Sequence, residues 1–232
     1  MIMVLDCETL DMQYNFIYDL AWAKVERNKI VDVRNFLVKE HLSRMATGSF
    51  SKEKVGATMD ELSNGNAEIK SWAEITAILA DDMSAAKHIY AYNAPFDRGK
   101  VSATCGALQV SSEFFDSSAI FDKWRDLWAW ASNTILYKKS YLDWCNAHGY
   151  LTDKGNFKTS AEVAIKFIMN DTDYVEKHTA RADVLDEYEI YKAIKREVKR
   201  EFSETCTAEE DGYKWKISPS YHIKRLNQAI AS

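Results

Sequence analysis

The stretch IMVLDCET at residues 2–9 joins a short apolar run to two acidic residues, Asp6 and Glu8. It predicts a buried strand over residues 2–7. Side chains two residues apart on a strand point to the same face, with Cα atoms roughly 6.5–7 Å apart, so Asp6 and Glu8 face one way and Cys7 the other. Two buried, unpaired carboxylates cost several kcal/mol, and a divalent cation offsets that cost because oxygen ligands suit it. Taken alone, the pair also fits the solvated end of a strand.

The segments after this strand include some with the apolar pattern of strands and others with the apolar spacing of helices. Apolar density predicts strands, and apolar residues at helical spacing predict amphipathic helices. Pro95 suits the first turn of a helix, where its missing N–H breaks no hydrogen bond. The expected elements are strands at 16–25, 30–38, 88–92 and 119–121, a turn at 27–29, a loop with a short helix within 41–70, and helices at 72–79, from Pro95 onward and at 179–202.

The composition describes a folded chain of moderate size. It has 232 residues, 47% of them hydrophobic, with 30 Lys+Arg against 35 Asp+Glu and a formal net charge of −5. These values exclude a disordered chain, a collagen-like fibre and a simple polybasic coat on nucleic acid. No repeat or Pro/Ser-rich linker divides the sequence. We therefore expect one domain over residues 1–202 and a C-terminal extension over 203–232.

The same sequence predicts a cytoplasmic protein. Its apolar runs are shorter than the ~20 residues of a membrane-spanning helix, and its start lacks the basic region of a secretory signal. Four cysteines are scattered singly, which favours reduced thiols. Only Cys145 and His148 have a ligand-like spacing, and one such pair cannot fill a tetrahedral zinc site. We expect no membrane partner.

Two later segments change the interpretation of the acidic pair. Asp97, in the run NAPFD at residues 93–97, falls in the first turn of a helix after a strand. His178 precedes the long C-terminal helix, and Asp183 follows it by five residues. Individually, Asp97 fits an acid stabilised by the helix dipole, Asp183 a surface residue and His178 a structural histidine.

Together and in this order, the three segments resemble the three exonuclease motifs of the DEDD superfamily, in its histidine subclass. This group includes the proofreading exonuclease subunits of DNA polymerases and RNase T. Residues 141–145 also resemble the helix that these proteins carry between the second and third motifs. The resemblance covers about residues 2–200 and is greatest to exonuclease-like proteins of bacteriophages. It implies a ribonuclease H-like α/β fold, with three antiparallel N-terminal strands, further parallel strands and flanking helices.

The resemblance also implies a reaction and a site. The activity would be 3′→5′ hydrolysis of single-stranded DNA or RNA, helped by two Mg²⁺ or Mn²⁺ ions. Catalytic residues would be Asp6, Glu8, Asp97, His178 and Asp183. The four acids would hold metal, with Asp6 bridging the ions. His178 would accept a proton from the attacking water, since imidazole titrates near neutral pH. The residues expected to contact substrate are Thr9, Leu10, Asn93 and Phe96.

The sequence departs from the family after the first motif, in the long aromatic stretch between the second and third motifs, and in the extension after about residue 202. Leu10 and Asp11 stand where a glycine often follows the first motif, so the terminal nucleotide could be held differently. The aromatic block at residues 121–130 has two interpretations: bases stacking on its tryptophans with nearby lysines and Arg125 holding phosphates, or a buried helical stripe of Trp124, Leu127 and Trp128. We favour the buried stripe.

Two alternatives to an exonuclease stay open. One is a catalytically idle nucleic-acid-binding module of the same fold, although such a module does not need a histidine base. The other is a subunit that docks a polymerase or repair partner through its C-terminal extension. A homodimer is likewise left open by the sequence.

Overall fold

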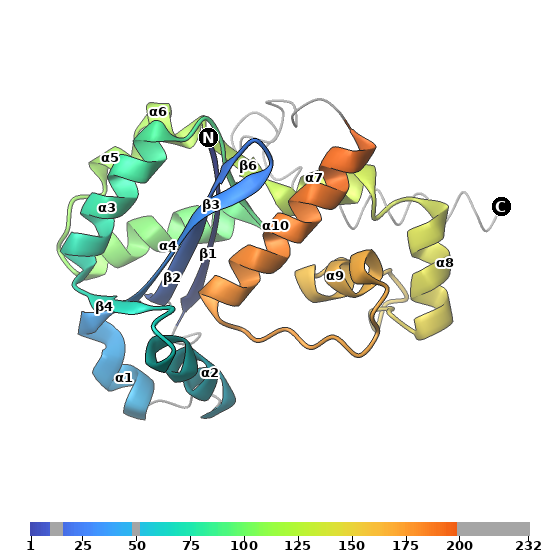
Figure 1. Ribbon diagram of the computed structural model, residues 1–232, viewed down its shortest axis with the longest axis horizontal. Coiled ribbons are helices and arrows are strands. Elements are labelled where there is room, and N and C mark those ends of the chain that lie inside the picture. The colour runs from blue at the N-terminus through green and yellow to red at the C-terminus, as the bar shows by residue number, and fades with distance from the viewer. Residues whose placement is uncertain (10–15, 48–51, 199–232) are drawn as a thin grey trace. The chain divides into compact units, whose positions relative to one another are not determined.

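The computed structural model describes residues 1–9, 16–47 and 52–198 (Figure 1). Its strands are β1 (Ile2–Thr9), β2 (Ile17–Glu26), β3 (Lys29–Val38), β4 (Glu68–Lys70), β5 (Ile89–Ala91) and β6 (Trp124–Asp126). Its helices are the 3₁₀ helix η1 (Lys39–His41), α1 (Leu42–Thr47), α2 (Lys52–Ser63), α3 (Trp72–Ala85), α4 (Ala94–Ala107), α5 (Glu113–Asp116), α6 (Ser118–Phe121), α7 (Leu127–Thr134), α8 (Lys139–His148), α9 (Ala161–Met169) and α10 (Ala180–Glu197).

The described chain forms two compact units. The first contains residues 1–124 and 176–185, and the second contains residues 125–175 and continues from Asp186. The boundary expected near residue 202 lies outside the described residues, so one domain with a C-terminal extension stays a prediction.

The strands form one sheet in the order β4-β3-β2-β1-β5-β6. Strands β1, β2 and β3 are antiparallel neighbours, whereas β5 runs parallel to β1 and β4 parallel to β3. The expected fold class is confirmed: this is a mixed sheet with three antiparallel N-terminal strands and flanking helices, the arrangement of a ribonuclease H-like fold.

The β2–β3 hairpin shows how local sequence sets the sheet register. Arg27 and Asn28 form its two-residue loop, with φ of 49° and 60°. Positive φ at both central residues is the requirement of a type I′ turn, whose twist matches that of the strands. The turn expected at 27–29 is confirmed.

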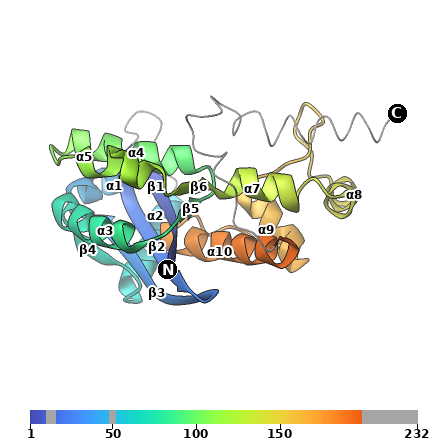
Figure 2. The same ribbon diagram turned by 90° about the horizontal axis from the view of Figure 1, so that it is seen from above.

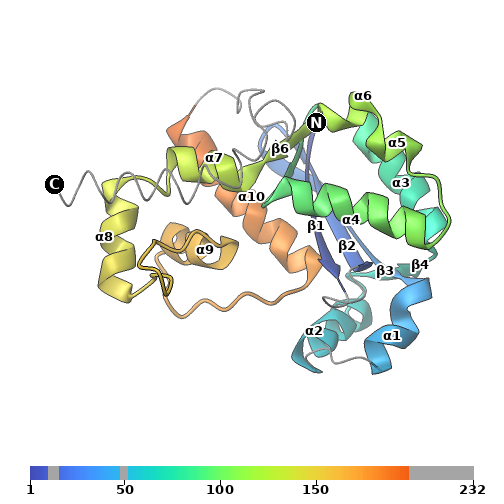
Figure 3. The same cartoon turned by 180° about the vertical axis from the view of Figure 1, so that it is seen from behind.

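One face of the sheet carries the larger core. Met3, Leu5 and Cys7 of β1 point to it and are buried together with apolar residues of α3 and α4. Helix α4 crosses β1 and β2 on this side, as the views from above and from behind show (Figures 2 and 3). The alternation of β1 therefore leaves Asp6 and Glu8 on the opposite face.

Two local expectations were wrong. Residues 41–70 contain two helices and a strand, α1, α2 and β4, not a loop with one short helix. Residues 118–121 form helix α6, not a strand, and the sixth strand follows at Trp124. A short apolar run fits a strand or a buried helical turn equally well, so periodicity cannot separate the two.

The aromatic block divides between β6 and α7, which corrects the single helical stripe. Trp124 lies in β6, while Leu127 begins α7, and both are buried as expected. Trp128 is half-buried, and its indole Nε1 donates to Thr159 Oγ1 at 2.9 Å. Trp124 is therefore buried within the fold, and the indole N–H of Trp128 is hydrogen-bonded there.

Two of the cations near this block, Lys123 and Arg125, do not fit the phosphate-holding interpretation. Lys123 Nζ donates to the carbonyl oxygens of Met83 and Ser84 at 2.9 and 2.8 Å. Arg125 is buried, with 4% of its surface exposed. Neither side chain is therefore placed to receive a nucleic-acid backbone.

Candidate active site

The acidic end of β1 is shaped by a β-bulge. Glu8 pairs with Asp19 on β2, but Thr9 pairs with Ile17, so Tyr18 is the extra residue. A bulge bends its strand and redirects neighbouring side chains, and bulges are frequent beside active sites. Here it lies directly opposite the step from Glu8 to Thr9.

Side chains from two other elements hold the bulge in place. Thr104 Oγ1 on α4 accepts a hydrogen bond from the backbone N–H of Ile17 at 3.1 Å. On the same residue, the carbonyl oxygen of Ile17 lies 2.6 Å from Nδ1 of the buried His41. The backbone groups of Ile17 are thereby satisfied without a regular ladder.

Asp97 lies against β1 from the other side. Its Oδ1 accepts a hydrogen bond from the backbone N–H of Cys7 at 3.2 Å, and 1% of the residue is exposed. Strand β5 pairs with β1 only at Met3 and Val4. Beyond that point, the carboxylate of Asp97 accepts the hydrogen bond of a β1 backbone N–H that a neighbouring strand would otherwise accept. Because this N–H belongs to Cys7, the bonded carboxylate oxygen lies at the β1 backbone between Asp6 and Glu8.

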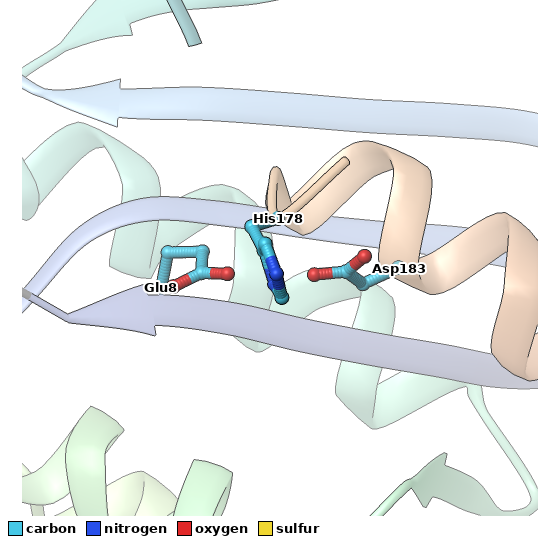
Figure 4. A group of neighbouring side chains, drawn as sticks. All are labelled: Glu8, His178 and Asp183. Carbon is cyan, nitrogen blue, oxygen red and sulfur yellow. The ribbon is translucent and has the colours of Figure 1, made fainter. Parts of the chain in front are cut away.

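Helix α10 delivers the third sequence motif to the same face. One ligand atom each of Glu8, His178 and Asp183 lie within 4.8 Å of one another. Figure 4 shows the His178 ring between the two carboxylates. Asp183 is buried, while 47% of the His178 side chain is exposed. Within the described residues, this group of close ligand atoms does not include Asp6 or Asp97. Asp6 lies in β1, and Asp97 is hydrogen-bonded to the β1 backbone.

Burial destabilises the ionised form of the Glu8 carboxylate, so this side chain requires a cation nearby to stay ionised. Desolvation raises the pKa of Glu8 above its ordinary value, while the Lys54 ammonium and His178 oppose this rise. Lys54 Nζ on α2 lies 3.3 Å from Glu8 Oε2. A positive charge from the chain itself therefore already lies beside the Glu8 carboxylate.

The donor set fits a divalent cation. Carboxylate oxygens are hard ligands of the kind that Mg²⁺ and Mn²⁺ prefer, and the site retains an exposed side for water. Ligand atoms sharing one ion at ~2.1 Å each lie at most ~4.2 Å apart, so the 4.8 Å group needs only a small adjustment. The residues that would hold the ions are Glu8 and Asp183, with Asp6 and Asp97 beside them.

Asp19 is a second buried acid next to this group. It is fully buried, and burial raises its pKa from 3.8 to about 7, although hydrogen bonds from Asn35 and Ala180 oppose the rise. Glu8 and Glu61 add to the increase through their charges. The ionised form of Asp19 is thus less favourable in the folded protein than in the unfolded chain.

This raised pKa predicts a pH dependence of stability. The folded protein binds a proton at Asp19 more tightly than the unfolded chain does, so the free energy of unfolding falls as pH rises from about 4 to 7. The slope is at most about 1.4 kcal/mol per pH unit. Chemical unfolding in chelator should show this fall for the wild type and a shallower one for Asp19→Asn, in which Glu8, whose pKa is also raised, still contributes. Parallel profiles for the two proteins would contradict the prediction.

The four expected substrate contacts have different outcomes. Thr9 ends β1, and Leu10 lies outside the described residues. Asn93 adopts φ of 75° before α4, and its buried Oδ1 has no hydrogen-bond partner among the described residues. Phe96 is 40% exposed, with Lys100 Nζ 4.9 Å from its ring centroid. A side chain exposed to this extent does not pack in the core.

Sequence reasoning missed Lys54, Asp19 and Tyr18. Lys54 lies in a segment expected to be mostly loop, and Asp19 interrupts an apolar strand. The buried charge within that strand was the one available signal, because such a group requires partners. By contrast, Cys145 and His148 do not form a joint site: Cys145 is buried, burial raises its pKa to about 11, and His148 is exposed.

Within the described residues, no helix is both long enough and apolar enough to cross a membrane. The sequence matches no protein-family model and no curated protein. Among solved structures, one similar chain is described as exonuclease X in complex with 5′ overhanging duplex DNA. It is 15% identical, with a TM-score of 0.44, and the alignment covers 90% of this chain and 98% of that one. A likeness of this size supports no functional argument.

Proposed function

We propose that the protein is a metal-dependent 3′→5′ exonuclease acting on single-stranded DNA or RNA, of the histidine subclass of the DEDD superfamily. The observation that supports this most directly is the approach of Glu8, His178 and Asp183 to within 4.8 Å, although 170 residues separate Glu8 from His178 in the chain. Divalent cations held there would stabilise the charge on the attacking and leaving oxygens of an in-line displacement.

The side chains have separate roles in this proposal. Glu8 and Asp183, together with Asp6 and Asp97, would hold the cations. His178 is exposed to water and accepts the proton of the attacking molecule. The imidazole lies between the two carboxylates in the view of Figure 4.

Phe96 and Lys100 are placed to hold the terminal nucleotide. The ring of Phe96 is exposed one residue before Asp97, and the Lys100 ammonium lies one helical turn further along α4. An aromatic face contributes ~1–3 kcal/mol per stacked base, and an adjacent lysine attracts phosphate. We assign Thr9 and Asn93 to the same subsite, together with Leu10.

The direct test uses single-stranded DNA and RNA oligomers labelled at either end, incubated with Mg²⁺, with Mn²⁺ and with chelator. The 5′-labelled oligomers should shorten one nucleotide at a time in metal and stay intact in chelator. A 3′-labelled oligomer should release its label as a mononucleotide in the first step. Binding without cleavage would support the idle module instead, and immediate release of the 5′ label would exclude 3′→5′ polarity.

Lys54→Met is predicted to tighten the binding of Mg²⁺ and Mn²⁺ by about two- to fivefold, the size of a partly exposed ion pair. An incoming cation would no longer have to displace the ammonium from Glu8. Isothermal titration in the absence of nucleic acid measures this. Lys87→Met, at an exposed position, is the charge-matched control and should bind metal like the wild type. Weaker metal binding by Lys54→Met would refute the competition.

A further inference from the structure

Asp19 stands out as a buried carboxylate that belongs to none of the three motifs. It lies on β2 and is fully buried. Asp19 Oδ1 accepts a hydrogen bond from Asn35 Nδ2 at 2.5 Å, and Asp19 Oδ2 accepts one from the backbone N–H of Ala180 at 3.1 Å. The second bond joins parts of the chain that are 161 residues apart.

Ala180 is the first residue of α10, so its N–H has no acceptor within the helix. The helix already has a local cap, since Thr179 Oγ1 accepts from the N–H of Ala182 at 3.3 Å. Asp19 therefore satisfies a different N–H, and it does so from a neighbouring strand. The bond from Ala180 to Asp19 therefore fixes the start of α10 to β2, in addition to the local cap that Thr179 provides.

The hydrogen bond between Asp19 and Ala180 lies next to the residues of the candidate site. His178 precedes Ala180 by two residues, and Asp183 follows it by three. Asp19 is also the cross-strand partner of Glu8. The carboxylate of Asp19 is thus bonded to the helix turn next to His178 and Asp183. Asp19 itself lies directly opposite Glu8, the third member of the group.

We propose that Asp19 is a positioning residue: its Oδ2 holds the first turn of α10 against β2 so that Asp183 and His178 face Glu8. The inference rests on the proposed function. Asp19 does not itself belong to the group of close ligand atoms, and it acts through the backbone of Ala180.

The test compares three single variants. Asp19→Ala removes the acceptor of the Ala180 N–H. Asp19→Asn keeps one oxygen for that N–H, and the amide of Asn35 can reorient to meet the new NH₂ group. Asn35→Ala is the matched control, because it leaves an unpaired group in the same buried pair but keeps the bond from Asp19 to Ala180.

Asp19→Ala should lower kcat by about 100-fold with little change in KM, the cost of a misplacement of about 1 Å. Its Kd for Mn²⁺, measured by calorimetry without nucleic acid, should rise about 10- to 100-fold, as for other changes behind metal ligands. Asp19→Asn and Asn35→Ala should stay close to the wild type in both. Equal losses in Asp19→Ala and Asn35→Ala, or none in either, would overturn the proposal.

Ala180→Pro provides a test that leaves Asp19 in place and decides the question if Asp19→Ala does not fold. Proline is accepted at the first position of a helix but has no N–H to donate. Its losses should match those of Asp19→Ala, and the double variant should lose no more than either single one. Additive losses, or an unchanged Kd for Mn²⁺ in Ala180→Pro, would overturn the inference. A wild-type protein that neither binds Mn²⁺ nor cleaves would instead refute the proposed function.

Discussion

Asp183→Asn should lower kcat by about 1,000-fold, because the site loses one metal-holding charge worth ~4 kcal/mol at ~1.4 kcal/mol per factor of ten. The substitution keeps the shape of a side chain that is 8% exposed. It also replaces one of two neighbouring, largely buried carboxylates by a neutral amide. In chelator, the variant should therefore be at least as stable to heat as the wild type. Lost activity with retained stability is the result that separates a functional acid from a structural one.

The matched control is Glu189→Gln on the same helix, since 42% of the Glu189 side chain is exposed and its ion pair within the described residues is the local one with Lys192. It should cleave at the wild-type rate. Single-turnover cleavage and thermal unfolding, each with and without Mg²⁺, measure the two effects. An Asp183→Asn protein that cleaves normally in Mg²⁺ would contradict the assigned role, as would an Asp6→Ala protein that does so.

His178→Asn should lower kcat by about 10²- to 10⁴-fold, the usual contribution of a general base, with a much smaller change in KM. Asparagine is the suitable replacement because His178 has φ of 54°, a region in which Asn is well tolerated. The replacement therefore removes the base and keeps the backbone that leads into α10.

Added imidazole provides the decisive check on this variant. It should restore part of the rate of His178→Asn and leave Asp183→Asn unchanged. His148→Asn, at another exposed histidine, should behave like the wild type. Equal losses in kcat and in substrate affinity, without imidazole rescue, would indicate that His178 positions the substrate instead.

Much of the fold could be predicted because its elements obey local rules. Strand β1 is an apolar run that ends in acids, and the β2–β3 loop is short and polar. Helix α3 begins at Trp72, directly after its N-cap Ser71, which forms a capping box with Glu74. One wrong assignment fell on the short apolar segment 118–121, where a helical turn and a strand have the same composition.

Less of the candidate site was predictable, since several of its contacts depend on the sheet register. The bulge at Tyr18 and the pairing of Asp19 with Glu8 appear only when β1 and β2 are aligned. Lys54 reaches Glu8 across 46 residues of sequence. The motif residues could be proposed because their types carry chemistry, whereas Lys54 and Asp19 are informative only through their neighbours.

The bond between Asp19 and Ala180 has a consequence for the order in which the protein is made. A ribosome has synthesised β1, β2 and β3 long before it reaches residue 180. Until then the acids of β1 lack both the helix turn that carries Asp183 and the imidazole that precedes it. On the proposed function, an unfinished chain could fold much of its sheet and still cut no nucleic acid.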